Sequence, residues 1–205
     1  MALETVRAAL IAAALLALAG CGDSSSGESG SPGTATSTAG SALARDVRQA
    51  ELTTRATPRD ADALARLIRL RFQAAGAGDN YSANTFSTAG MAELRRAAAD
   101  WSRYLALDPR KPDVQLASLM VQVFGVNALD DPRRAVGAQK IVIAQRQLPE
   151  ASLYAQLALL HYQAKQTAAG DRAAARAVAL SPPGQRAPLR RQLRQLRSPP
   201  ASQGP

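Results

Sequence analysis

Two side chains suited to nucleophilic chemistry each occur once in this chain, Cys21 and His161. A thiolate is a nucleophile, and imidazole is the common general base that activates one. A nucleophilic triad also needs an orienting group and a base beside the nucleophile, and no second histidine is present to supply them. His161 lies on the packing face of a predicted helix, so we expect it to be a buried histidine with a hydrogen-bonding partner.

Other patterns that carry chemistry are missing from the sequence. It has no glycine-rich phosphate loop, no paired-histidine motif and no carboxylates clustered at ligand spacing. A single cysteine excludes internal disulfides and cysteine-based metal sites. We therefore expect no enzyme activity, no catalytic residue, no metal and no cofactor.

Cys21 follows Arg7 and an apolar run from Ala8 to Ala19. That run is too short to span a bilayer comfortably and indicates a secretion signal. Its end, Leu18-Ala19-Gly20-Cys21, resembles a bacterial lipobox. The resemblance implies thioether lipidation of Cys21, cleavage before it and a lipid anchor on the extracytoplasmic side of a cell membrane. A plain signal peptide or an uncleaved anchor, with an accidental cysteine, is the alternative.

The composition divides the chain into four parts. Residues 1–20 are predicted to be the lipoprotein signal peptide, and residues 21–41 the lipidated cysteine with a disordered Gly/Ser/Thr linker. Such a linker buries too little apolar surface to offset its ordering entropy. A glycosylated stalk is the other interpretation. Residues 42–197 are predicted to form a helical repeat domain, and residues 198–205 a disordered tail.

The domain has the periodicity of helices. Alanine and leucine supply most of its apolar residues and aromatic residues make up 4% of the chain, which favours an all-α fold. Tyr154, Leu157, Ala158 and His161 share one helical face. An alanine-rich run follows and ends before Pro182, which cannot continue a helix. This layout resembles a tetratricopeptide repeat, a helical hairpin of about 34 residues.

The resemblance implies an α-solenoid of about three tetratricopeptide-like hairpins with a C-terminal capping helix. The hairpins are predicted over residues 58–109, 112–148 and 149–182. The second departs from the family pattern, because Gln139 stands where an aromatic residue is expected. Alanine-rich hairpins of another kind are the alternative.

Members of this family hold peptides or partner proteins in a concave groove lined by the first helix of each hairpin. The resemblance therefore implies a protein–protein interaction scaffold for an unknown envelope protein or peptide. The candidate groove residues are Arg66, Gln73, Gln115, Gln122 and Tyr162. The paired lysines and asparagines with which some members clamp a terminal carboxylate are not evident. A subunit accessory to an enzyme is a further interpretation.

The segment from Gln185 to Arg197 combines a leucine stripe with a cationic face that has no acidic residue. Its basic residues are Arg186, Arg190, Arg191, Arg194 and Arg197. One role is structural, because a repeat stack needs a terminal helix over its last hydrophobic face. The other is binding of anionic lipid or a cell-surface polyanion. The net charge of +9 also suits nucleic acid, but export removes most such targets, so no nucleic-acid partner is expected.

The stretch Gly76–Gly90 is a long insert within the first predicted hairpin. Polar residues between Asp79 and Asn84 suggest calcium, but Tyr81 and Ala83 interrupt the spacing of an EF-hand loop. The other interpretation is that Tyr81 and Phe86 attach the insert to the helices.

Overall fold

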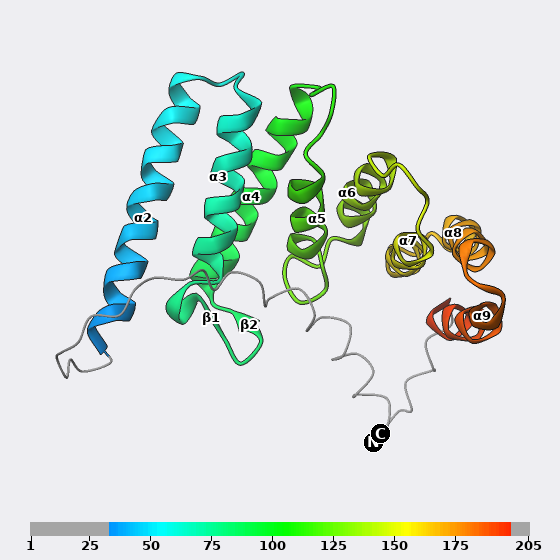
Figure 1. Cartoon of the computed structure of the whole chain (residues 1–205). Helices are drawn as coiled ribbons and strands as arrows, with labels where there is room; N and C mark the ends of the chain where they lie inside the picture. Colours follow the sequence, from blue (N-terminus) through cyan, green and yellow to red (C-terminus); the bar gives the residue numbers. More distant parts are fainter. Residues whose placement is uncertain (1–32, 198–205) are drawn as a thin grey trace, which may run out of the picture. The chain divides into compact units, whose positions relative to one another are not determined.

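The computed structural model describes residues 33–197, and most of these are helical (Figure 1). The helices are α2 (Gly33–Ala56), α3 (Ala61–Ala75), α4 (Thr88–Ala106), α5 (Val114–Val123), α6 (Pro132–Ala144), α7 (Ala151–Gln163), α8 (Thr167–Leu180) and α9 (Pro183–Arg197). None of the helices in this range is long and apolar enough to cross a membrane. The predicted signal peptide, Cys21 and the predicted tail lie outside the described residues.

Helix α2 begins earlier than the sequence pattern predicts. Its first residue is Gly33, within the stretch assigned to the linker, whereas the helical domain was expected from residue 42. A formed helix propagates more easily than it nucleates, so a strongly helical stretch can extend into neighbouring alanines and threonines. The helix therefore overlaps the last residues of the stretch predicted to be linker.

Several helices begin at side chains that cap their first backbone N–H groups. Asp60 accepts hydrogen bonds from the amides of Asp62 and Ala63 at the start of α3. Asp113 and Asp131 cap α5 and α6 in the same way. Such caps stabilise a helix by about 1 kcal/mol each and fix where it starts.

Successive helices pack in pairs, α3 with α4, α5 with α6 and α7 with α8 (Figure 1). Helix α4 also contacts α5, α6 contacts α7, and α9 packs on α7 and α8. One core cluster runs through these elements, and its largest fully buried apolar side chains are Leu64, Ile68, Leu94, Leu116, Met120, Val123 and Phe124. Each pair thus shares its apolar face with the next.

Trp101 is buried in α4 and stacks on Tyr104 of the same helix with ring centroids 5.3 Å apart. Two hydrogen bonds then join one pair of helices to the next. The Tyr104 hydroxyl accepts a hydrogen bond from the Asp113 amide at 2.9 Å. Gln139 is only 2% exposed, and its amide nitrogen donates to the Leu153 carbonyl at 3.1 Å. The residue that departs from the family pattern therefore links α6 to α7.

Helix α2 is held to α3 by a small apolar cluster and a buried arginine. The cluster contains Val47 and Ala50 of α2 with Leu67 of α3. The Arg71 guanidinium reaches Glu51 of α2 at 2.8 Å.

The same guanidinium binds two carboxylates of α4, Glu93 at 3.0 Å and Asp100 at 2.9 Å. Burial alone lowers the pKa of Arg71, but the hydrogen bond to Glu93 and the charge of Asp100 outweigh it, so the pKa is raised. Arg71 therefore stays charged and connects three helices.

The Gly76–Gly90 insert contains a small hairpin that the sequence pattern did not predict. It consists of a 3-10 turn (Gly78–Asn80) and the antiparallel strands β1 (Tyr81–Ser82) and β2 (Thr85–Phe86). Ala83 and Asn84 have φ of 47° and 61°, as a two-residue hairpin turn of type I′ requires.

Phe86 packs on the core, as predicted for the attachment of the insert, whereas Tyr81 is 40% exposed and contacts the Phe86 ring, with ring centroids 4.7 Å apart. Among the described residues, no group of three or more His, Cys, Asp or Glu side chains is placed to hold a metal ion.

Candidate functional site

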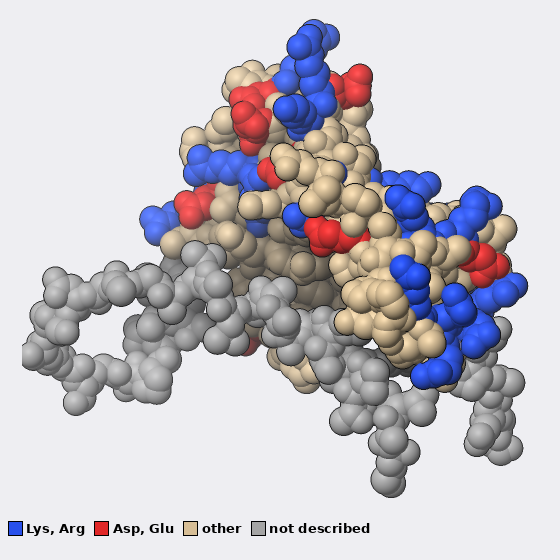
Figure 2. All heavy atoms as spheres, turned by 45° about the vertical axis from the view of Figure 1, so that its right-hand side comes forward, with Lys and Arg blue, Asp and Glu red and all other residues tan. Residues whose placement is uncertain are grey.

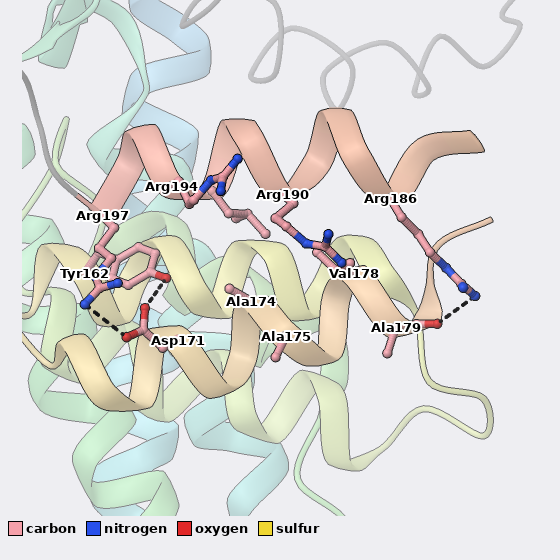
Figure 3. A pocket seen from close by; sticks show the side chains of 11 residues that line it. Tyr162, Asp171, Ala174, Ala175, Val178, Ala179, Arg186, Arg190, Arg194 and Arg197 are labelled. Atoms are coloured by element: carbon pink, nitrogen blue, oxygen red, sulfur yellow. Dashed lines mark hydrogen bonds and ion pairs between the residues drawn. The ribbon is translucent and has the colours of Figure 1, made fainter. Parts of the chain in front are cut away.

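A cleft of about 480 Å³ lies between α8 and α9, with one residue of α7 at its edge (Figure 3). Its α8 wall consists of small apolar side chains, those of Ala174, Ala175, Val178 and Ala179. Its α9 wall carries the arginines Arg186, Arg190, Arg194 and Arg197. We call this feature the arginine cleft.

Helix α9 is oriented by its leucines. Leu193 is 4% exposed, and Leu189 and Leu196 pack against the same core from partly buried positions. Leucines at spacings of three and four form one apolar stripe, so the arginines between them must face elsewhere. Packing the stripe on α7 and α8 places four of the five arginines along the cleft.

The turn between α8 and α9 is fixed by side-chain bonds to backbone carbonyls. Ser181 is buried, and its hydroxyl donates to the Ala177 carbonyl at 2.9 Å. Arg186 donates from Nε to the Ser181 carbonyl at 2.9 Å and from Nη2 to the Ala179 carbonyl at 3.5 Å. Arg186 therefore closes one end of the cleft and satisfies carbonyls at the end of α8.

Tyr162 and Asp171 form the other end (Figure 3). The Tyr162 hydroxyl donates to Asp171 Oδ1 at 3.0 Å, and Arg197 Nη2 lies 3.5 Å from Asp171 Oδ2. Burial of the phenol, its hydrogen bond to Asp171 and the negative charge of Asp171 raise the pKa of Tyr162 from 10.0 to about 12, while Arg197 acts in the opposite direction. Tyr162 is therefore a neutral hydrogen-bond donor throughout the physiological range.

The cleft lies in the most basic part of the chain. Residues 151–197 contain eight basic residues and one acidic residue, Asp171, which gives this segment +7 of the total net charge of +9. Figure 2 shows Lys and Arg side chains gathered at its lower right, where α8 and α9 lie in Figure 1. Because Asp171 is bound by Tyr162 and Arg197, the remaining arginines of the cleft are not neutralised by it.

Of the five residues predicted to line a groove, four lie outside the arginine cleft and one lines it. Arg66 and Gln73 are exposed on α3, and Gln115 and Gln122 are exposed on α5, and none of them lines the arginine cleft. Tyr162 lines the cleft together with Arg186, Arg190, Arg194 and Arg197. Arg191 is exposed on α9 outside the cleft. One predicted groove residue and four predicted anion-binding residues thus share one site.

Sequence reasoning missed the α8 side of this site. The sequence patterns give no role to Gly170, to Asp171 or to the wall from Ala174 to Ala179. A usable signal was present, because Asp171 is the single acidic residue in a strongly basic stretch and therefore has many possible cationic partners.

His161 has the environment expected for a histidine on a packing face. It is 5% exposed, and its Nδ1 lies 2.7 Å from Oε1 of Gln166. Because an amide oxygen only accepts hydrogen bonds, Nδ1 carries the proton. The backbone N–H of Gln166 donates to the His161 backbone carbonyl at 2.8 Å, so the two residues close the turn between α7 and α8.

Fold and site together describe an all-α protein with a cationic cleft near the end of its helical domain. Comparisons of the chain with protein-family models, with curated proteins and with solved structures find no match.

Proposed function

We propose that this protein is a non-catalytic binding module that holds a segment of another envelope protein. In this proposal the pairs α3–α4, α5–α6 and α7–α8 are tetratricopeptide-like hairpins of an α-solenoid, and α9 is its capping helix. A lipid anchor at Cys21 keeps the module on the extracytoplasmic side of the membrane.

The observation that carries the proposal is the arginine cleft, which is lined by arginines of α9 and by small apolar side chains of α8. Guanidinium groups bind carboxylates in bidentate geometry, and alanines permit close approach of a bound chain. The pairing of consecutive helices supports a repeat architecture. The hydrogen-bonded, buried state of His161 supports a role in packing rather than in proton transfer.

A second candidate function is binding of anionic lipid or a surface polyanion through α9. It is favoured by the absence of acidic residues from α9 and by Arg191, which is exposed outside the cleft. The two functions differ in salt dependence. Binding to a charged surface should weaken steeply as the Debye length falls from about 10 Å at 0.1 M salt, whereas binding in a cleft should weaken less.

The test is crosslinking in cells with a photoreactive phenylalanine analogue at Ala175, on the apolar wall of the cleft. We expect a discrete protein adduct, identified by mass spectrometry, that disappears when Arg190 and Arg194 are both replaced by Glu. The same analogue at Gln115 tests the predicted first-helix surface, and at Lys140, exposed on α6, it is the control.

An adduct at Gln115 but not at Ala175 would move the binding surface to the first helices of the pairs. Adducts of equal yield at Ala175 and Lys140, or lipid adducts alone at Ala175, would contradict the proposal. The salt dependence of the adduct yield then separates cleft binding from surface adhesion.

A further inference from the structure

The two middle arginines of the cleft differ from the two at its ends. Arg186 is bound to backbone carbonyls and Arg197 to Asp171. Arg190 and Arg194 are exposed and have no hydrogen bond or ion pair with any residue in the described range 33–197. Figure 3 shows Arg190 extending from α9 toward α8. Both residues line the cleft, so two arginines there are available to a ligand.

The opposite wall offers no charge to these two arginines. Ala174, Ala175, Val178 and Ala179 present methyl and isopropyl groups, and the one carboxylate of the cleft, Asp171, lies at its end and is already bound. A ligand that fills the cleft must therefore bring negative charge to the α9 side and small apolar groups to the α8 side.

The packing of α9 argues for a chain-like ligand rather than a membrane. A helix that lies in a lipid interface keeps a free apolar face to insert between the lipids. The apolar face of α9 is covered by the protein itself, because Leu193 is buried and Leu189 and Leu196 pack on the core. Four of its five arginines also line the cleft.

The spacing of the two arginines sets the spacing of the ligand charges. Arg190 and Arg194 are four residues apart on α9, which is about 6 Å along a helix axis. In an extended peptide, residues i and i+2 point to the same side and are about 6.7 Å apart. The residue between them points to the opposite side, toward the α8 wall. Adjacent acidic residues would place only one carboxylate on the arginine side.

From these observations we propose that the arginine cleft binds an extended segment of a partner protein with the pattern acidic–small–acidic. The two carboxylates pair with Arg190 and Arg194, and the small side chain between them packs on Ala175 and Val178. This assignment rests on the proposed binding function and names the class of segment that the site takes.

The test is a binding titration of the full chain with three labelled peptides at about 0.15 M salt. The first contains Gly-Ser-Glu-Ala-Glu-Ser-Gly, the second the same residues as Gly-Ser-Glu-Glu-Ala-Ser-Gly, and the third Gln in place of both Glu residues. We expect the first to bind about tenfold more tightly than the second, since one charge-assisted pair is lost, and the third not to bind.

Matched variants connect this preference to the cleft. Arg190→Gln and Arg194→Gln should each weaken binding of the first peptide by about tenfold, because each removes one charge-assisted pair. The control, Arg191→Gln, also removes one positive charge from α9, but outside the cleft. It should change the affinity for the first peptide by less than about twofold, because an exposed, screened charge contributes little. All three positions are exposed, so thermal unfolding should be unaffected.

Equal affinity for the first two peptides, or an equal effect of Arg191→Gln and Arg194→Gln, would overturn the assignment. So would vesicles with anionic phospholipid that bind through Arg190 and Arg194 while the peptides do not. If the adduct at Ala175 forms in cells but the peptides show no spacing preference, this ligand class is wrong and the proposed function survives. If both fail, both are wrong.

Discussion

The ring of Tyr162 on α7 lies directly against the backbone of α8 at Gly170. A Cβ atom at position 170 would stand 2.4 Å from Cε1 and 2.5 Å from Cδ1 of the tyrosine. The absence of a side chain at Gly170 thus lets the ring approach α8 and directs its hydroxyl to Asp171, 3.0 Å away. A glycine that weakens a helix intrinsically is here what shapes one end of the arginine cleft.

Gly170→Ala should therefore destabilise the protein although alanine is the better helix former. The intrinsic gain of about 1 kcal/mol is outweighed by overpacking, which costs about 1–3 kcal/mol. We expect a net loss of up to about 2 kcal/mol in the free energy of unfolding, measured in urea. Gly137→Ala is the matched control, because Gly137 is exposed within α6 and a Cβ there meets nothing within 4 Å. It should stabilise by up to about 1 kcal/mol, and a loss at both positions would contradict this account.

The raised pKa of Tyr162 predicts a late step in an alkaline titration. Ionisation of Tyr162 should change the ultraviolet absorbance near pH 12, and this change should be absent from the Tyr162→Phe variant. Because the folded-state pKa lies above the ordinary value of 10.0, the stability this group contributes is complete below pH 10 and is lost as the pH rises toward 12. Gly170→Ala should move the step to lower pH, since it displaces the ring from Asp171. A step unchanged in both variants would rule out this hydrogen bond.

Removal of the buried arginine should have a larger effect than any change in the cleft. Arg71→Met leaves Glu51, Glu93 and Asp100 without their common partner, and breaking a buried pair from one side costs about 3–5 kcal/mol. The control is Arg55→Met, whose guanidinium lies 3.9 Å from Glu51 on the surface and should contribute less than about 1 kcal/mol. Chemical denaturation monitored by circular dichroism compares the two, and equal effects would contradict the network.

The proposed lipid anchor predicts that the protein leaves the membrane fraction when Cys21 is replaced. Cys21→Ser removes the only thiol and should move the protein from the membrane fraction to a fraction released without detergent. Mass spectrometry of the wild-type protein should show a chain that begins at Cys21 and carries acyl chains. Membrane association that persists in Cys21→Ser, or a wild-type chain that retains Met1, would contradict the anchor.

The turn of the insert predicts that replacing alanine by glycine has opposite effects on stability in the turn and in a helix. Ala83 has φ of 47°, a left-handed conformation that costs an L-residue about 1–2 kcal/mol. Ala83→Gly should relieve this cost, but glycine also gives the unfolded chain more conformational freedom, which offsets part of the gain. We therefore expect the variant to be more stable by about 0.5–1 kcal/mol. Ala99→Gly, at an exposed position within α4, should destabilise it by about 1 kcal/mol. Thermal unfolding of both variants measures the difference, and two changes of the same sign would argue against the strained turn.

The helical content of the domain could be predicted from sequence, because it depends on local properties. Apolar residues recur at spacings of three and four. The sequence pattern ends helices before Pro109, Pro149 and Pro182, and in the structure α4, α6 and α8 end before these prolines. The buried state of His161 followed from its place on such a face. The hairpin in the insert was missed because its turn residues, Ala83 and Asn84, lack the glycine that usually marks such a turn.

By itself the sequence determined which residue types this protein offers to a ligand, since α9 has five arginines and no acidic residue whatever its surroundings. Only the tertiary structure decided which of them form a site. Packing of the α9 leucines sets the direction of Arg190 and Arg194, and the missing side chain at Gly170 sets the position of Tyr162. These are contacts between helices, and residue spacing within a single helix contains no information about them.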